Sequence, residues 1–329
     1  MKKCTHASVV FPRLRTHNRH SHTHTRPYAQ TSSSAMTLPR LPSIAVLVVL
    51  GTLGIGCASD SGSSNAGSSP EAAPSPTDTL TLDTRADSVA SRLMQAHGAD
   101  AFSSAPYLRF TFAVETPKGT RVIGRHLWDR TTGDYRVEWT GGPDSSYVAL
   151  VNVRSVAEGV PEGIVYLNGE KLEGDAAQTA RKQAYGRFVN DTYWLLAPLK
   201  VFDSGVNRAY AADSSTAEHD VLHLTFGEVG LTPGDEYWFY VSTETGQLDR
   251  WAFHLQGMSA DAPARQYRWT ADTTLTAPDG PVTLATRKEA VGAEQAILTH
   301  DLALPSSPPD GAFSNPEPML APRTDEGSS

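Results

Sequence analysis

Cysteine is almost absent from this chain, because the 329 residues include only Cys4 and Cys57. Neither lies in the central part of the chain, which has the composition of a folded domain. The sequence therefore excludes a disulfide or a cysteine-ligated metal site within that domain. Burial of apolar side chains must stabilise the fold instead, and all six tryptophans lie between Trp128 and Trp269.

The signatures of common enzymes are missing as well. The chain has no Gly-x-Ser-x-Gly elbow, no phosphate-binding loop, no dinucleotide-binding glycine pattern and no His-Glu-x-x-His. We therefore predict no catalytic residue, no metal site and no cofactor, and a protein that is not an enzyme. A hydrolase is a third alternative, because a triad built from residues far apart in the sequence leaves no spacing signature.

His219, Asp220 and His223 form the most suggestive group of titratable side chains. Residues 221–226 have the composition of a β-strand, and four strand residues span roughly 13 Å. One metal ion would not reach both histidines on a strand, so we interpret them as ordinary strand residues. His97, next to Gly98, is interpreted in the same way as a residue at the end of a helix.

Positive charge is scarce after Cys57, where 21 basic residues stand against 36 acidic ones and the net charge is −15. A surface this acidic repels phosphate backbones and anionic headgroups, so we expect no nucleic-acid partner. Membrane association must then come from an anchor rather than from basic patches. Adaptation to a salt-rich habitat and simple solubility both explain such an excess of acid.

A long hydrophobic run is also missing. Residues 44–55 are apolar, but a membrane-spanning helix needs about 20 such residues. The run follows Met36 and Arg40 and ends in small residues, which is the three-part layout of a signal peptide. We expect residues 36–56 to be removed as a leader, and residues 1–35 to be translated sequence upstream of a true start at Met36.

The residues Leu53-Gly54-Ile55-Gly56-Cys57 resemble the lipobox of bacterial lipoproteins, with Gly54 where such boxes usually carry leucine. The resemblance implies that Cys57 receives diacylglycerol and anchors the mature protein to a membrane. Ala58 after the cysteine implies, by the sorting rules of that family, an outer-membrane address facing the periplasm. Residues 57–82 are interpreted as the lipidated cysteine and a flexible Ser/Gly/Pro linker. An ordinary secretory peptide with an incidental cysteine is the alternative.

The central part of the chain, residues 83–303, begins with a helical pattern and continues with strand patterns. Apolar residues recur at helical spacing over residues 83–97, whereas residues 108–114 alternate like a half-buried strand. Asn168-Gly169 between apolar runs predicts a tight hairpin. Further strands are predicted at residues 121–128, 134–139, 147–153, 164–167, 221–226, 236–241, 249–255, 265–269, 282–286 and 295–302.

A second helix is predicted from Asp175 toward Phe188, followed by the segment 193–199, which is apolar on every side and ends regular structure at Pro198. This segment is expected to be buried and to plug the fold. Residues 237–240 are aromatic on both faces of their strand, which indicates a sheet that is covered on one side and curved on the other. We predict a mainly β (α+β) fold, a curved antiparallel half-barrel sheet with a few helices covering or plugging it.

The opening helix, the strand meander with a midway helix and the lipoprotein leader together resemble the LolA/LolB type of lipoprotein-localisation fold. Residues 193–206 and 232–246 resemble segments of uncharacterised envelope lipoproteins that are grouped with this fold. The resemblance implies a half-barrel whose concave apolar face shelters the acyl chains of a client. No residue of this chain matches a functional motif of those proteins, so the resemblance assigns no binding residues.

These features predict a membrane-anchored, non-catalytic envelope lipoprotein that binds a lipid, a lipidated client or another apolar ligand. The alternative is a structural module that meets a protein partner through its acidic outside, with its aromatic residues packed as a core. Residues 304–329, rich in Pro, Ser and acid, are predicted to be a disordered tail. The predicted apolar pocket is lined by Trp194, Leu196, Leu199, Trp238, Tyr240, Trp251 and Phe253.

Overall fold

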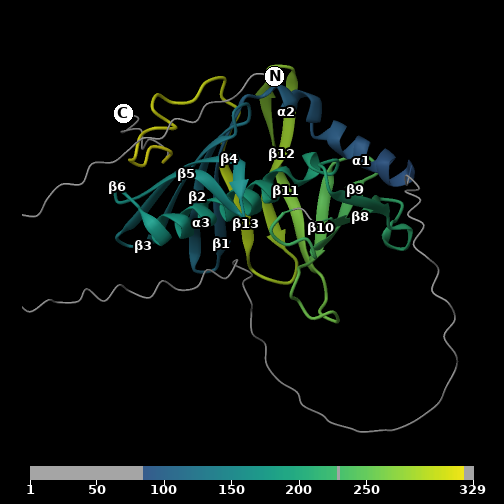
Figure 1. Cartoon of the computed structure of the whole chain (residues 1–329). Coiled ribbons are helices and arrows are strands. Elements are labelled where there is room, and N and C mark those ends of the chain that lie inside the picture. Colours follow the sequence, from purple (N-terminus) through teal and green to yellow (C-terminus); the bar gives the residue numbers. More distant parts are fainter. Residues whose placement is uncertain (1–83, 228–229, 322–329) are drawn as a thin grey trace, which may run out of the picture. The chain divides into compact units, whose positions relative to one another are not determined.

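The computed structural model describes residues 84–227 and 230–321 (Figure 1), which belong to one compact unit, Pro76–Ser329. The predicted leader, the predicted lipid-acceptor Cys57 and the linker all lie outside the described residues. The predictions for residues 1–35, 36–56 and 57–82 therefore stay predictions.

A 13-stranded antiparallel sheet dominates the described residues, in the order β6-β5-β4-β3-β2-β1-β13-β12-β11-β10-β9-β8-β7. Almost every strand pairs with its neighbour in sequence, and the pairing of β1 with β13 joins the two halves of the meander. The strands are β1 (Tyr107–Thr116), β2 (Gly119–Asp129), β3 (Asp134–Gly142), β4 (Ser145–Ala157), β5 (Val160–Leu167), β6 (Glu170–Lys171), β7 (Val206–Tyr210), β8 (His219–Phe226), β9 (Glu236–Ser242), β10 (Leu248–His254), β11 (Arg265–Ala277), β12 (Gly280–Ala290) and β13 (Ala296–Ala303).

The predicted Asn168-Gly169 turn and one glycine within a strand determine how β5 pairs with its two neighbours. Asn168 and Gly169 connect β5 to β6 with φ angles of 52° and 82°, as a two-residue hairpin with positive φ at both positions requires. Gly163 serves a different purpose, because a Cβ at this position would lie 2.2 Å from the carbonyl oxygen of Leu150 on β4. Glycine therefore allows β5 to approach β4 closely.

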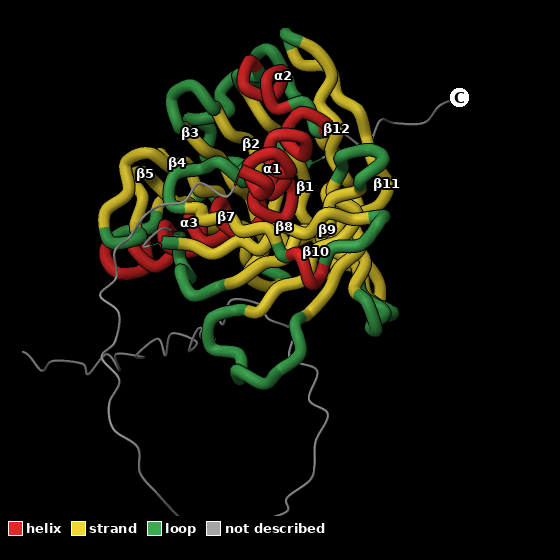
Figure 2. The backbone as a smooth tube through the Cα atoms, turned by 90° about the vertical axis from the view of Figure 1, so that its right-hand side faces the viewer, coloured by secondary structure: helices red, strands yellow, loops and turns green. Residues whose placement is uncertain are grey.

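Three α-helices accompany the sheet in the described part of the chain: α1 (Thr84–Ala96), α2 (Ala99–Ser104) and α3 (Gly174–Leu196). Two short 3₁₀ turns follow, η1 (Ala197–Leu199) and η2 (Ala212–Ser214). α1 and α2 lie on the same side of the sheet (Figure 2), and their buried side chains join one core with it. The predicted first helix is thus confirmed, whereas the second helix continues eight residues beyond its predicted end.

The sheet curves far enough for strands that are distant in its order to share one core. Five strands separate β1 from β8, yet Phe110 of β1 and Leu222 of β8 belong to the same principal core. β6 and β7 stand at the two ends of the strand order and do not pair, so the sheet stays open. The predicted mainly β half-barrel is therefore confirmed.

Two cores lie on the concave face of the sheet. The principal core joins β1 and β8–β13 with α1, α2 and the end of α3. The second core packs Ala180 and Ala184 of α3 against β3, β4 and β5. Because α3 contributes to both cores, it bridges them across the concave face.

The chain beyond β13 does not trail away as the predicted tail. Residues 305–321, here called the C-terminal strap and drawn in yellow near the C label in Figure 1, pack against the convex face of the sheet. Ala312 and Leu320 are buried against Leu127 of β2. The prediction of a disordered tail is wrong for these residues, because a few apolar side chains and main-chain hydrogen bonds fix a segment whose composition alone suggests disorder.

Candidate functional site

The concave face of β9, β10 and β11 is an apolar surface made largely of aromatic rings. We call this set the aromatic interior. The centroids of neighbouring rings in it lie 5.1–6.4 Å apart, for example Trp251 and Trp269 at 5.1 Å and Tyr237 and Phe239 at 6.4 Å. Such spacing is typical of favourable aromatic packing. Its members are Tyr237, Phe239, Trp251, Phe253, Tyr267 and Trp269.

Residues 193–201, the plug segment, lie on the aromatic interior. Trp194 meets Trp251, Tyr267 and Phe253 edge to face, with ring centroids 4.6, 4.9 and 6.1 Å apart. Leu195, Leu196, Leu199 and Val201 are buried, whereas Trp194 and Tyr193 are only half-buried. The predicted role of this segment as a plug therefore agrees with where it lies.

The structure brings five of the seven predicted pocket residues together. The five that share the principal core are Trp194, Leu196, Leu199, Trp251 and Phe253.

The other two, Trp238 and Tyr240, lie on the convex face of the sheet. In the ladder between β9 and β10, Trp251 is opposite Phe239, whereas Trp238 is opposite Ala252. Residues directly opposite each other share a face, so Trp238 and Tyr240 point away from the aromatic interior. The sequence pattern showed two aromatic faces but did not tell which face each residue would join.

Trp238 and Tyr240 belong to a group of polar and aromatic side chains on the convex face. The ring of Trp238 stacks on His223 at 4.7 Å, and Arg250 lies over the ring of Tyr240 at 3.9 Å. His223 also bonds to Glu236 at 2.8 Å, while His219 bonds to Asp249 at 3.0 Å. Each histidine on β8 thus has its own carboxylate, and no metal-binding group of histidine, cysteine and acid residues occurs in residues 84–227 and 230–321.

A buried polar group lies where the two cores meet under α3. Nδ1 of His126 is 2.5 Å from the hydroxyl of Tyr135, and its Nε2 is 3.2 Å from Asp191 of α3 without good hydrogen-bond alignment. Burial lowers the pKa of His126, although the nearby carboxylate of Asp191 opposes this. Burial likewise raises the pKa of Tyr135. This group ties α3 to β2 and β3.

Lys288 of β12 is a cation that the sequence interpretation missed. Its side chain is fully buried, and its Nζ donates to the carbonyl of Ala285 at 2.7 Å and to Oγ1 of Thr299 at 3.2 Å. Burial lowers the pKa of Lys288 from 10.5 to about 7, with the charge of Asp272 opposing. Lys288 shares the inward-facing row of its strand with Val282 and Leu284, and a lysine in such a row is the sequence signal for a buried cation.

His97 is buried and structural, in agreement with its interpretation as a residue at a helix end. Its Nδ1 is 2.7 Å from the Thr283 carbonyl, and its Nε2 accepts from the Leu248 amide at 3.2 Å. These partners fix the neutral form with the proton on Nδ1, and burial lowers the pKa of His97. Both ring nitrogens are occupied, so His97 has no free atom for chemistry.

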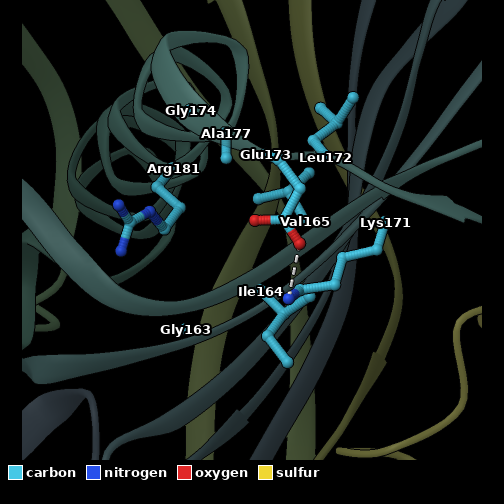
Figure 3. Close-up of a pocket in the computed structure, with 9 residues that line it drawn as sticks. All are labelled: Gly163, Ile164, Val165, Lys171, Leu172, Glu173, Gly174, Ala177 and Arg181. Carbon is cyan, nitrogen blue, oxygen red and sulfur yellow. Dashed lines mark ion pairs between the residues drawn. The ribbon is translucent and has the colours of Figure 1, made fainter. Parts of the chain in front are cut away.

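A surface pocket of about 330 Å³ lies at the other end of the sheet (Figure 3). β5, β6 and the first turns of α3 line it, with Ile164, Leu172 and Arg181 among its residues. The ion pair between Lys171 and Glu173, at 2.7 Å, lies across it and is largely exposed. The pocket holds no pair of groups arranged for acid–base or nucleophilic work, and it does not touch the aromatic interior.

None of the helices within the described residues is long and apolar enough to cross a membrane. No protein family profile matches the sequence, and no curated protein matches it either.

Solved structures that resemble the chain share its general fold only weakly. A DUF1329 family protein from Desulfovibrio piger is 11% identical, with a TM-score of 0.40, over 69% of this chain and 96% of its own. An outer membrane lipoprotein-sorting protein domain from Vibrio parahaemolyticus is 6% identical, with a TM-score of 0.37, over 70% of this chain and 97% of its own. The protein MucB is 13% identical, with a TM-score of 0.18, over 70% of this chain and 62% of its own.

Proposed function

We propose that this chain is a non-catalytic protein of the cell envelope that binds a lipid, a lipidated client or another apolar ligand on the concave face of its half-barrel. The observation that carries the proposal is the plug segment, whose Tyr193 and Trp194 lie on the aromatic interior but are only half-buried. A ligand with an apolar chain would replace the plug segment on this surface.

The free energy of apolar burial allows a ligand to take the place of the plug segment. Apolar burial is worth about 25 cal/mol per Å² whichever chain supplies it, so an acyl chain can replace the contacts that Trp194 makes. The plug segment contains only the last turn of α3 and the 3₁₀ turn η1, in which Pro198 keeps the helix from continuing. The plug segment can therefore move while the first turns of α3 stay packed on β4 and β5.

The anchor is the second part of the proposal. The apolar run 44–55, the small residues after it and Cys57 support lipidation at Cys57, and Ala58 supports attachment to the outer membrane on its periplasmic side. We expect radioactive or clickable fatty-acid label to enter the protein in growing cells and to be lost in Cys57→Ser. Label retained in Cys57→Ser would refute the anchor.

Ligand binding is tested on protein taken from its native envelope. Native mass spectrometry of the purified chain should show an added mass that dissociates as a lipid, and delipidated protein should regain it on soaking with envelope lipids. Protein that stays empty in both cases would contradict the proposal.

A second candidate function follows from the way the described interior is closed by its own side chains. A half-barrel that stays packed would act as an interaction module whose acidic outside meets a protein partner. Cross-linking in intact cells would then trap one protein repeatedly, and no lipid would be taken up.

A further inference from the structure

Lys288 places a positive charge within the apolar part of the half-barrel. In the two ladders of β12, Lys288 is directly opposite Trp269 on β11 and Ile297 on β13. Opposite residues share a face of the sheet, and both neighbours belong to the principal core. The ammonium group therefore lies on the face that also carries the plug segment.

The contacts of Lys288 leave one ammonium donor without an acceptor. Two donors go to the Ala285 carbonyl and the Thr299 hydroxyl, and the Nζ atom lies 4.9 Å from the centroid of the Trp269 ring. An ammonium group has three donors. Among the described residues, no carboxylate forms an ion pair with Lys288.

The Ala285 carbonyl gives Lys288 a structural role, but this role does not need a charge. β12 and β13 pair only over Arg287, Lys288 and Glu289, so the Ala285 carbonyl lies beyond the end of that ladder. A neutral donor would satisfy this carbonyl equally well. Burying an ammonium group without a carboxylate costs several kcal/mol, which makes a lysine an expensive choice for the purpose.

Two indole donors in the same core are also without partners. Trp251 and Trp269 are 1% and 5% exposed, and their Nε1 atoms have no acceptor in the part of the chain that the structure describes. An unsatisfied buried donor costs about 1–3 kcal/mol. The principal core thus combines one unpaired cation with two unpaired N–H groups and no acid among them, an excess of donors that an acceptor from outside would relieve.

We propose that the ligand of the half-barrel carries an anionic head group on an apolar chain, and that Lys288 binds this head group. The inference rests on the proposed function, because the ligand reaches Lys288 only by replacing the plug segment. Oxygen atoms of the head group take the third ammonium donor, so the bonds to Ala285 and Thr299 stay in place. The apolar chain lies along the aromatic interior. A single buried cation also explains how a chain with so acidic an exterior holds an anion.

The test compares two probes with the same apolar chain, hexadecanoate and hexadecanol, on the full chain. Hexadecanoate should bind about tenfold more tightly or better, because a charge-assisted hydrogen bond in a buried site is worth more than a neutral one. In Lys288→Met this preference should disappear while the affinity for hexadecanol stays the same. Lys118→Met, which removes an exposed lysine in the turn between β1 and β2, is the control and should keep the preference.

The outcomes separate the inference from the function on which it rests. If the wild-type chain binds both probes equally, the anionic head group is refuted and apolar binding stands. If it binds neither, both the inference and the proposed function fail. A preference that persists in Lys288→Met would show that another group holds the anion.

A measurement on the wild-type chain covers the case in which Lys288→Met does not fold. Bromine quenches tryptophan fluorescence at short range, so a fatty acid brominated next to its carboxylate should quench more strongly than one brominated at the far end. Replacement of Trp269 by Phe should reduce this difference. Equal quenching by both acids would contradict a head group next to Lys288.

Discussion

Arg136 and Lys288 are fully buried cations on opposite faces of the same sheet, and they are paired in different ways. On the convex face, Nε of Arg136 donates to Glu138 at 2.6 Å, and its other nitrogens donate to the carbonyls of Ala312, Asn315 and Glu317 in the C-terminal strap. Glu138 in turn accepts from the amides of Met319 and Leu320. On the concave face, Lys288 has one carbonyl, one hydroxyl and no carboxylate.

The difference separates a structural charge from one that is available for binding. Arg136 and Glu138 neutralise each other and bind the main chain of the C-terminal strap. These two buried charges therefore find their partners within the chain itself. One ammonium donor of Lys288 and the indole donors of Trp251 and Trp269 lack an acceptor, and in our proposal the ligand supplies one. The following predictions test this contrast, from the largest expected effect to the smallest.

Arg136→Met should cause the largest loss of stability. The substitution leaves Glu138 buried without its partner and three strap carbonyls without a donor, which should lower the free energy of unfolding by about 3–5 kcal/mol. Urea denaturation measures this, with Arg268→Met at an exposed position of β11 as the control. A loss below about 1 kcal/mol would show that the strap contributes nothing to the fold.

Leu320→Ala should loosen the strap. Leu320 is 4% exposed and packs with Leu127, so its truncation should cost about 2–3 kcal/mol and speed hydrogen exchange at the amides of the strap. Met319→Ala, next to it and only partly buried, is the matched control. Exchange that is equally slow in both variants would contradict the packing of the strap.

Lys288 should make stability depend on pH. Its folded pKa, about 7, lies below the ordinary value of 10.5, so the folded state binds fewer protons between these values. Stability should therefore rise by about 2 kcal/mol as the pH increases from 7 toward 9, and the cost of the buried charge should be fully present below pH 7. Lys288→Met should flatten this slope, and an unchanged slope in that variant would assign it to other groups.

Lys288→Met should have the smallest effect on the stability of the empty protein. Methionine matches the volume of the lysine chain and removes the cost of the unpaired charge, while the Ala285 carbonyl loses a donor. The free energy of unfolding at neutral pH should stay within about 1 kcal/mol of wild type or exceed it. A loss as large as that of Arg136→Met would abolish the contrast between the two faces.

Alternation along the strands was enough to predict most of the sheet, and Asn168-Gly169 predicted its hairpin. β7 was not predicted, because apolar and polar residues alternate only weakly in Val206–Tyr210, at the edge of the sheet. The packing of the C-terminal strap was not predicted, because it depends on Arg136 and Glu138, which are more than 170 residues away in sequence. Composition describes only the local chain, so it cannot reveal such a partner.

Local sequence also predicted only part of the candidate site. Trp194, Trp251 and Phe253 meet as expected, because an apolar segment beside an apolar strand face must be buried somewhere. Trp238 was assigned to the wrong face, since the face of a residue depends on which strand position starts the alternation. Lys288 was missed because the predicted strand ended at Thr286, whereas β12 continues to Ala290.

The central claim is that an apolar ligand replaces the plug segment on the aromatic interior, and titration of the full chain with fluorescently labelled fatty acid tests it most directly. Trp194→Ala removes plug contacts worth about 1–2 kcal/mol, so it should increase the population of the open form and tighten apparent binding about five- to thirtyfold. Trp238→Ala, on the convex face, should leave the affinity unchanged. Unchanged or weaker binding in Trp194→Ala would contradict the claim.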